Sequence, residues 1–391
     1  MGRASSSVST SGICWASSDN PILDEAVIEL RSALAGHALQ HIVTFFSLEH
    51  DAGGLSAALT TAFPGVRITG CSTAGEITPS GMIEGGIVLI GFPPDGFRIH
   101  TGLIENIDEF GVERATHIVR KLKEDAAKGN SDGQRNDRTF ALLMIDGMSN
   151  AEETLVAAIH WAMDDVQLVG GSAGDDLAFE RTALVYDGRP VQKAAILMMV
   201  ESDFDFRVFK TQNFDPTTVK LVVTAADTEN RIVYELNAEP AALEYASAIG
   251  LMPNDLGPFS FASYPLVVKV GGDYFCRSIR NMNTDGSLSF FCAIDEGLVF
   301  TVARPQDMIR STTETFDDIE RSLGGIDFVI GFDCILRRLD AENRQIRREL
   351  NELYNRYRVV GFHTYGEQYN AMHLNQTLTG IAFGTRAAPR P

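Results

Sequence analysis

The sequence is poor in positive charge. It holds 33 Lys and Arg residues against 52 Asp and Glu residues, which gives a formal net charge of −19 over 391 residues. Such a surface would repel a phosphate polyanion, so we expect no nucleic-acid partner. The longest purely apolar run, 194–200, is far too short to span a bilayer, and no polybasic anchor is present. We therefore expect no membrane partner either.

Cysteine is also scarce. The five cysteines are scattered, and no Cys-x-x-Cys pair occurs. This pattern favours free thiols in a reducing compartment over a disulfide framework or a structural zinc site. We expect a cytoplasmic protein, and covalent c-type haem attachment is excluded because it needs Cys-x-x-Cys-His.

The apolar runs predict a mixed α/β fold. Runs rich in β-branched and aromatic residues, such as 41–48 and 139–145, predict strands, whereas amphipathic segments such as 109–128 predict helices. A chain of this length exceeds one typical core. We expect two domains with mixed sheets, β-hairpins and covering helices, at 19–235 and 236–385, after a disordered polar leader over 1–18.

A long helix is predicted from about Leu336 to Tyr357. Its leucines and isoleucine follow a heptad, with Asn343 at a core position, which is the pattern of a paired coil. An amphipathic helix packed on its own sheet shows the same stripe. We favour the packed helix, and a homodimer remains the alternative.

One turn motif recurs along the chain. The segment "VVGFHTYGEQ" at 359–368 repeats "ITGCSTAGEI" at 68–77, and "LVGGSAGDD" at 168–176 is a looser echo. Glycine permits close approach, and the exposed amides and hydroxyls of such a turn can hold a polar group. The following acid could accept hydrogen bonds from a ligand's ammonium or from nearby backbone amides.

Two such turns from distant parts of the chain would line one cleft between the domains, where small-molecule sites prefer to lie. The alternative is that they are structural turns whose acids cap local backbone. The residues expected to bind a small-molecule ligand are Gly70, Ser72, Thr73, Gly75, Glu76, Ser172, Asp175, Arg277, Thr364, Tyr365, Gly366 and Glu367. Arg277 could pair with a carboxylate, although an exposed strand face also explains it.

Several segments resemble the FIST family: "GCSTAGEI", "GGSAGDD", "DGRPVQKAAIL", "YPLVVKVGG", "DGSLSFF" and "GFHTYGEQYNAMHLNQTLTG". The resemblance implies an N-terminal and a C-terminal FIST domain in an intracellular sensor. Such a sensor binds a small ligand and signals through a separate partner, such as a histidine kinase, a cyclic-nucleotide enzyme or a chemoreceptor. A similar bacterial subset senses nitric oxide with haem bound through a histidine.

His373 and His363 are the candidate haem-binding residues, because both flank the last glycine–acid motif. A five-coordinate haem needs one neutral imidazole held by a second-shell acceptor, and His373 is the expected metal ligand. Nitric oxide could then switch a two-state interface by weakening the iron–histidine bond. The alternative for each histidine is a satisfied structural role.

An enzyme is not expected. Residues 170–174 match G-x-S-x-G around Ser172, and Asp327 or Asp333 and then His363 or His373 follow in the order used by α/β-hydrolases. That motif needs a helix directly after the serine, whereas a loop and a strand are predicted here. The resemblance to the haem-binding subset of the FIST family makes a haem-based nitric oxide sensor the first hypothesis. A sensor that binds an amino-acid-like ligand, with Glu76 or Glu367 on the ammonium and Arg277 on the carboxylate, is the second, and a serine hydrolase is the third.

Overall fold

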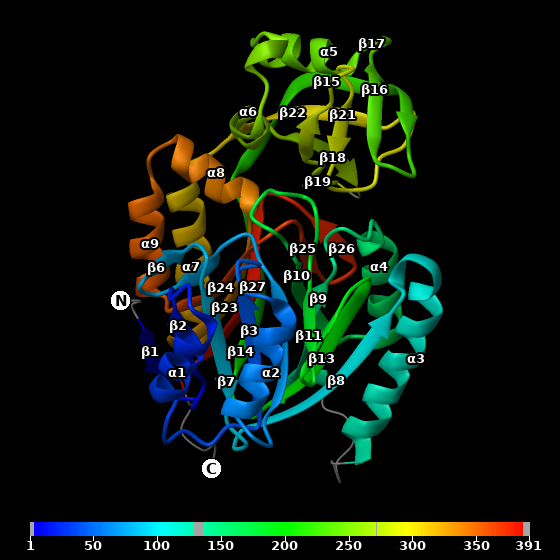
Figure 1. The fold of residues 1–391 in the computed structure, drawn as a ribbon. Coiled ribbons are helices and arrows are strands. Elements are labelled where there is room, and N and C mark those ends of the chain that lie inside the picture. Colours follow the sequence, from blue (N-terminus) through cyan, green and yellow to red (C-terminus); the bar gives the residue numbers. More distant parts are fainter. Residues whose placement is uncertain (1–3, 129–135, 271, 386–391) are drawn as a thin grey trace.

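The computed structural model describes residues 4–128, 136–270 and 272–385, which form a body of three mixed sheets and a smaller lobe with a fourth sheet (Figure 1). The smaller lobe spans 214–305, and we call it the upper lobe. The mixed α/β class predicted from the sequence is confirmed. Within the described residues, no helix has both the length and the apolar character needed to cross a membrane.

The body is built from three units with the same strand order. The first unit comprises β2 (Cys14–Ser18), α1 (Leu23–Ala33), β3 (His41–Phe46), α2 (Ala52–Ala62), β4 (Arg67–Ser72), the hairpin β5 (Glu76–Thr78) and β6 (Gly81–Ile83), and β7 (Ile87–Phe92). In the sheet these strands lie in the order β2-β7-β3-β4, with β3 and β4 parallel. The strand β1 (Ser5–Val8) extends the outer edge.

The other two units repeat this order. The second comprises β8 (Phe97–Glu105), α3 (Ile107–Lys128), a 3₁₀ turn (Asn136–Arg138), β9 (Thr139–Ile145), α4 (Glu152–Met163), β10 (Gln167–Ser172), the hairpin β11 (Leu184–Tyr186) and β12 (Arg189–Val191), and β13 (Ala194–Ser202). The third comprises β14 (Phe206–Gln212), α7 (Met308–Leu323), β23 (Ile326–Cys334), α8 (Ile335–Asn343), α9 (Arg347–Arg356), β24 (Val359–Thr364), the hairpin β25 (Glu367–Tyr369) and β26 (Met372–Leu374), and β27 (Thr377–Gly384). The upper lobe is inserted into the third unit, between β14 and α7.

Each unit lends its hairpin to another unit. The hairpin β5–β6 pairs with β24, β11–β12 pairs with β4, and β25–β26 pairs with β10. The three sheets are therefore each completed by residues from elsewhere in the chain. This exchange ties the units into one body around a common centre.

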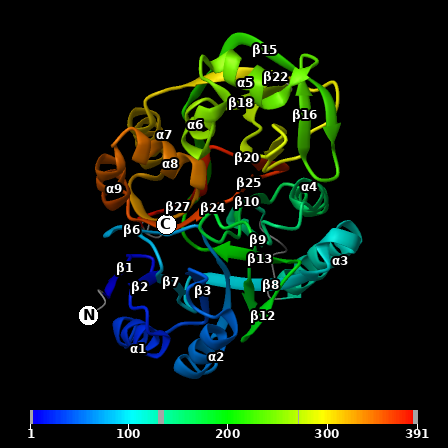
Figure 2. The same ribbon diagram turned by 45° about the horizontal axis from the view of Figure 1, so that its top comes forward.

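The centre of the body is a core shared by all three sheets. Phe45, Phe140, Phe332, Phe362 and Phe383 are almost fully buried in it, and the rings of Phe45 and Phe362 lie 4.6 Å apart. Burying each such ring contributes about 1.5–3 kcal/mol. The opposite face of each sheet packs against helices, which lie as three groups around the outside: α1 with α2, α3 with α4, and α7 with α8 and α9 (Figure 2).

The upper lobe has its own sheet and core. Its elements are β15 (Phe214–Asp227), β16 (Ile232–Leu236), β17 (Glu239–Pro240), α5 (Ala241–Ile249), a 3₁₀ turn (Pro253–Asp255), α6 (Pro258–Ser263), β18 (Leu266–Val270), β19 (Asp273–Cys276), β20 (Ile279–Met282), β21 (Leu288–Phe290) and β22 (Val299–Pro305). The domain boundary expected between residues 235 and 236 lies within this lobe, at the end of β16.

Two expectations from the sequence are wrong. Residues 5–8 and 14–18 form strands instead of a disordered leader, because the amides of Thr10 and Ser11 each donate to the carboxylate of Asp327 (2.8 Å) and β2 pairs with β7. Residues 1–3 lie outside the described residues. The helix expected to run without a break from Leu336 is two helices, because Gln345 adopts a left-handed conformation (φ 59°) between α8 and α9.

Candidate functional site

Three glycine turns meet at one end of the body. We call them turn 1 (70–76), turn 2 (170–176) and turn 3 (361–367), and each begins in the second parallel strand of its unit. Turns 1 and 2 are joined by two hydrogen bonds. The hydroxyl of Ser72 donates to the carbonyl of Gly174 (2.8 Å), and the amide of Gly174 donates to the carbonyl of Ser72 (3.1 Å).

Turn 3 closes the ring of contacts. The amide of Ser172 donates to the carbonyl of Gly366 (2.8 Å). The amide of Ala74 donates to the carbonyl of His363 (2.9 Å), and the amide of His363 donates to the carbonyl of Gly75 (2.7 Å). Each turn therefore bonds to both of the others, so the motif recurs because the fold needs three matching turns where its three units meet.

The first glycine of each turn is required by a close approach of two parallel strands. A Cβ atom at these positions would lie 2.0, 1.9 and 1.7 Å from a backbone carbonyl oxygen; the pairs are Gly70 with Thr44, Gly170 with Leu143 and Gly361 with Gly331. No side chain can occupy that space. These glycines are therefore explained by packing alone, without a ligand.

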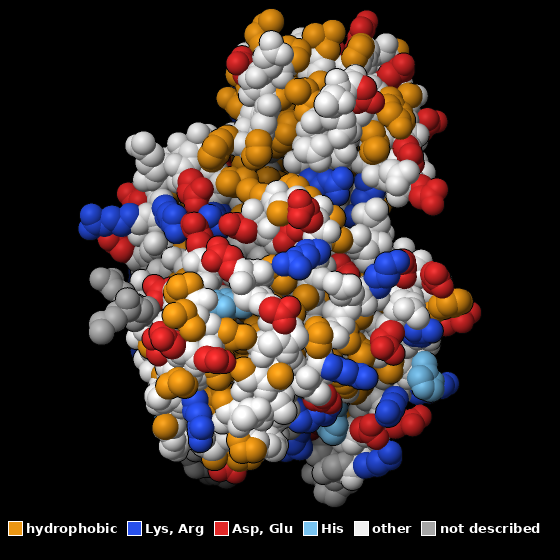
Figure 3. Space-filling view, viewed as in Figure 1, with side chains coloured by type: hydrophobic (Ala, Val, Ile, Leu, Met, Phe, Trp, Pro, Cys, Tyr) orange, Lys and Arg blue, Asp and Glu red, His pale blue; other side chains and the backbone are white. Residues whose placement is uncertain are grey.

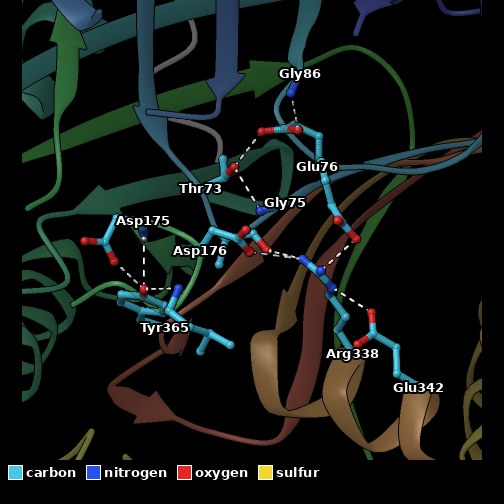
Figure 4. Close-up of polar contacts among 12 residues, drawn as sticks. Thr73, Gly75, Glu76, Gly86, Asp175, Asp176, Arg338, Glu342 and Tyr365 are labelled. Atoms are coloured by element: carbon cyan, nitrogen blue, oxygen red, sulfur yellow. Dashed lines mark hydrogen bonds and ion pairs between the residues drawn. The ribbon is translucent and has the colours of Figure 1, made fainter. Parts of the chain in front are cut away.

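The acids that end turns 1 and 3 bind groups of the protein itself, and Figure 4 shows the first of them, Glu76. Glu76 is fully buried and accepts hydrogen bonds from the hydroxyl of Thr73 (2.6 Å) and the amide of Gly86 (3.2 Å). Burial raises the pKa of Glu76 to about 8. Glu367 is equally buried and accepts from the amide and hydroxyl of Thr377 (3.1 and 2.7 Å), and burial raises its pKa well above the ordinary value.

The raised pKa of Glu76 predicts that the protein loses stability as pH rises. In the unfolded chain this carboxyl ionises near 4.5, whereas in the folded chain it stays protonated up to about pH 8. Between these values the unfolded chain has released a proton that the folded chain retains, so the free energy of unfolding falls with rising pH. We expect the free energy of unfolding, measured with urea, to fall between pH 5 and pH 8. This fall should be smaller in Glu76→Gln than in the unmodified protein by at least about 1 kcal/mol. An equal loss in both proteins would contradict the prediction.

Turn 2 is followed by a loop over 176–183, which we call the long loop, whereas turns 1 and 3 lead almost directly into their hairpins. Asp175 organises it: its carboxylate accepts from the amides of Phe179 (2.9 Å), Glu180 (2.7 Å) and Arg181 (3.0 Å) and from the hydroxyl of Tyr365. The loop packs on the upper lobe. Asp175 and Tyr365 therefore link turns 2 and 3 to the lobe through protein contacts.

Arg338 of α8 fixes turn 1 from the side (Figure 4). Its Nη1 donates to the carbonyl of Ala74 (2.9 Å) and its Nη2 to the carboxylate of Glu84 (2.7 Å), and Asp176 lies 3.4 Å from Nη1. A Cβ atom on Gly75 would lie 2.8 Å from this guanidinium. The second glycine of turn 1 therefore makes room for an arginine of the same chain.

The hydroxyl residues of the turns are sealed from solvent. Ser72, Thr73, Ser172, Thr364 and Tyr365 are at most 2% exposed. Ser172 lies in β10, which leads into the long loop and not into a helix, and its hydroxyl accepts from the side-chain amide of Gln368 (2.9 Å). The structure thus brings the expected residues of the turns together as a packed junction.

His363 lies in β24 and is fully buried. Among the described residues neither ring nitrogen has a hydrogen-bond partner, and Nδ1 is 3.9 Å from the carboxylate of Asp333. Burial, reinforced by the positive charge of Arg338, keeps its pKa well below the ordinary value. The ring is therefore a neutral imidazole inside the third unit.

His373 lies in β26, beside the upper lobe. Its Cε1 atom is packed so tightly on Gly366 that a Cβ there would lie 2.1 Å away. Its Nδ1 is 3.5 Å from the side-chain nitrogen of Gln368, and its buried Nε2 has no partner. Burial lowers its pKa to about 4, against the opposing effect of Glu153. His373 is thus neutral at pH 7, and among the described residues its Nε2 meets no partner in hydrogen-bonding geometry, although the backbone of Phe291 in the lobe acts to raise its pKa.

The upper lobe covers His373 through a buried ion pair. The guanidinium of Arg231, 4% exposed, bonds Glu152 (2.9 Å) and Glu153 (2.7 Å) at the start of α4 and also donates to the carbonyl of Phe291. Glu153 in turn accepts from the amide of Ala293 (2.6 Å). We call the place where α4, the hairpin β25–β26 and the upper lobe meet the covered joint. Figure 3 shows Lys and Arg side chains gathered where the lobe rests on the body.

Arg277 belongs to the same region. It lies half-buried after β19, its Nη1 donates to the carbonyl of Cys276 (3.2 Å), and its positive charge helps to depress the pKa of His373. Of the residues expected from the sequence, the covered joint therefore gathers His373 and Arg277, with Gly366 and Glu367 directly beneath.

The covered joint has two counterparts in the other units. In each unit a helix packs against the hairpin lent by another unit: α2 against β12, α4 against β26, and α9 against β6. Beside α2 lies a cavity of about 400 Å³, and beside α9 one of about 580 Å³. Of these three joints, only the one at α4 is covered by the upper lobe, and we therefore take it as the candidate site.

Space around the histidines does not fit a haem in this arrangement. The ring of His373 abuts Gly366, both histidines are at most 3% exposed, and the cavities described above are lined by other residues. Within the residues that the structure describes, no three His, Cys, Asp or Glu side chains are placed to hold a metal ion. The donor chemistry of His373 suits a metal, but the packing leaves it no room.

Sequence reasoning missed Glu152, Glu153, Arg231 and Ser278. The two acids open a helix, where acids are common, and Arg231 stands in a polar turn. One structural signal marks Arg231, since it is buried in a left-handed conformation (φ 57°) that non-glycine residues rarely adopt. That conformation is not visible in the sequence.

Family models match almost the whole body and lobe. The FIST N domain matches residues 40–239 and the FIST C domain matches residues 241–370. The chain belongs to the FIST family. The resemblance inferred from the turn motifs is confirmed at the level of the family, and the border between the two FIST domains falls inside the upper lobe.

Comparisons with individual proteins give weaker similarities than the family models do. An uncharacterized protein of Methanocaldococcus jannaschii is 24% identical over 219 residues, which is 56% of this chain. The matched region spans only 40% of that relative's length. A cyanuric acid hydrolase from A. caulinodans is similar over 98% of this chain and 99% of its own, with 8% identity and a TM-score of 0.37.

Proposed function

We propose that this FIST protein senses a small ligand with an ammonium or guanidinium group, which binds at the covered joint in place of Arg231. FIST domains are sensory, ligand-binding domains of signalling proteins. The observation that carries the proposal is a set of buried side-chain atoms that have no hydrogen-bond partner among the described residues: Nε2 of His373 and Oε1 of Gln368 on the hairpin β25–β26, and Oγ of Ser278 in the upper lobe. Each such atom costs about 1–3 kcal/mol, so a ligand that satisfies them gains affinity.

The charges at the joint define the ligand. Glu152 and Glu153 already hold one guanidinium, so a second cationic group can compete for them. Arg277 lies close enough to act on His373 and can pair with a carboxylate, which makes an amino-acid-like molecule the best match. Displacing Arg231 removes a link between the lobe and α4, and the altered lobe would be read by a separate partner protein such as a histidine kinase, a cyclic-nucleotide enzyme or a chemoreceptor.

Ligand-induced stabilisation tests this function. We expect at least one of L-arginine, L-lysine, L-alanine and agmatine to raise the melting temperature saturably, as binding to the folded state requires. Glu153→Gln should weaken that response about tenfold or more, which corresponds to 1.4 kcal/mol. Glu349→Gln, an exposed acid on α9, is the matched control and should leave it unchanged. No saturable response, or an equal response in Glu153→Gln, would disprove the proposal.

A haem-based nitric oxide sensor is the second candidate, favoured by the free Nε2 of His373. It requires the lobe to move away from the hairpin, because the present packing leaves no room for haem. Haemin titrated into the protein should then shift its Soret band, and reduction followed by nitric oxide should shift it again, with both changes lost in His373→Ala. A band that stays at the position of free haemin would exclude this candidate.

A further inference from the structure

The cavity beside α2 is the counterpart of the covered joint in the first unit. It measures about 400 Å³ and lies between the start of α2 and the hairpin β11–β12, within the size range of small-molecule sites. No lobe covers it, so it opens to solvent. Its lining includes His50, Asp51 and Arg181, which carry three different polar chemistries.

His50 is the unusual member of this lining. It is only 3% exposed, and its buried Nε2 has no hydrogen-bond partner in the part of the chain that the structure describes. Burial lowers the pKa of His50, against the opposing effects of the Gly85 backbone and of Glu49, so the ring is neutral at pH 7. A neutral imidazole has one nitrogen that donates and one that accepts, and in the tautomer protonated at Nδ1 the Nε2 atom accepts a hydrogen bond.

Arg181 supplies a charge at the same cavity. Its side chain is exposed, and its guanidinium has no ion-pair partner in the part of the chain that the structure describes. A free guanidinium pairs well with a carboxylate. Asp51 is occupied at one oxygen, where it accepts from the amide of Gly54 (2.7 Å) and caps α2.

We infer that this cavity is a second ligand site, for a small carboxylate that also carries a hydroxyl or amino donor. The carboxylate pairs with Arg181, and the donor satisfies Nε2 of His50. The site also reaches the upper lobe, because Arg181 belongs to the long loop, whose Phe179 packs on Phe291 of the lobe with ring centres 5.6 Å apart. Ligand bound here therefore contacts the same loop that touches the lobe.

Nitrogen NMR of histidine tests the site directly. In protein labelled with ¹⁵N-histidine, with the His50 signal assigned through His50→Gln, glycolate is expected to shift the Nε2 resonance saturably. Acetate lacks the donor and ethylene glycol lacks the carboxylate, so each should bind about tenfold more weakly or worse. The readout is the His50 resonance, and His50 lines the cavity beside α2 and not the covered joint, so failure of the proposed function would leave this result unchanged.

The control separates a built site from general attraction of anions. Arg181→Gln, at an exposed position, should weaken the glycolate response about tenfold while leaving the melting temperature unchanged. Arg348→Gln removes an exposed charge on α9 and should leave the glycolate response unchanged. No saturable shift at His50, an equal response to acetate, or an unaltered response in Arg181→Gln would overturn the inference.

Discussion

Replacing Gly361 with alanine is expected to prevent the chain from reaching its native structure. The new Cβ atom would lie 1.7 Å from the carbonyl oxygen of Gly331 in the neighbouring parallel strand, and backbone on both sides cannot move without separating β23 from β24. We expect a loss of more than about 4 kcal/mol in the free energy of unfolding, seen as aggregation or as a lost near-ultraviolet signal. The same reasoning applies to Gly70 and Gly170 in the other two units.

Gly257→Ala is the matched control. Gly257 has extended backbone (φ −175°), and a Cβ atom there would meet no other atom within 4 Å. Its urea midpoint should stay close to that of the unmodified protein. If Gly361→Ala instead folded with an unchanged midpoint, the close strand approach at the three turns would be refuted.

Replacing Arg337 with methionine should cost the folded protein about 3–5 kcal/mol, because it leaves a buried carboxylate without its cation. Arg337 is 1% exposed, and its Nε donates to Asp333 (2.6 Å) while its Nη1 donates to Asn213 (2.6 Å). Tyr354 also donates to Asp333 (2.6 Å) and cannot neutralise the charge. Urea unfolding monitored by circular dichroism measures the loss.

Two further variants identify the cause. Arg348→Met removes an exposed arginine that pairs with Glu352, and it should leave the urea midpoint nearly unchanged. The double variant Asp333→Asn with Arg337→Met removes both charges and should be more stable than Arg337→Met alone. If the double variant were no more stable than the single one, lost packing and not the uncompensated charge would explain the effect.

The three-unit body gives these effects a common origin. At one end of the body its three units are joined by matching turns that hydrogen-bond to one another, so a change at one turn affects all three sheets. The third unit has two helices, α8 and α9, between its parallel strands, where each of the other units has one, and it differs in two further respects. It holds the buried Asp333–Arg337 pair, and the upper lobe is inserted into it.

Much of the fold was predictable from local patterns. The strands around Val43 and Leu142, the hairpin turn at Gly188 and the amphipathic helix ending at Lys128 each follow from the period of their apolar residues and from their turn chemistry. The leader was missed because its strands depend on partners far away, such as Asp327. The break at Gln345 was missed because a left-handed residue other than glycine leaves no mark in the sequence.

The candidate site was predictable only in part. His373 and Arg277 were named from the sequence, whereas Glu153 and Arg231 were not, although the last two form the ion pair that holds the upper lobe. Their positions depend on the hairpin β25–β26 joining another unit's sheet and on the lobe folding back over it. Nothing within a few residues of Arg231 indicates either event.

The amino-acid sequence by itself determined the mixed α/β class, the FIST family and the recurrence of one turn, because each depends on residue types at fixed local spacing. Only the tertiary structure decided what the turns do. They close on one another because the strand exchange brings three backbones within hydrogen-bonding distance, and the unsatisfied polar atoms were thereby left beside the upper lobe. Long-range pairing of this kind is set by the summed packing of the whole core, which no short stretch of sequence carries.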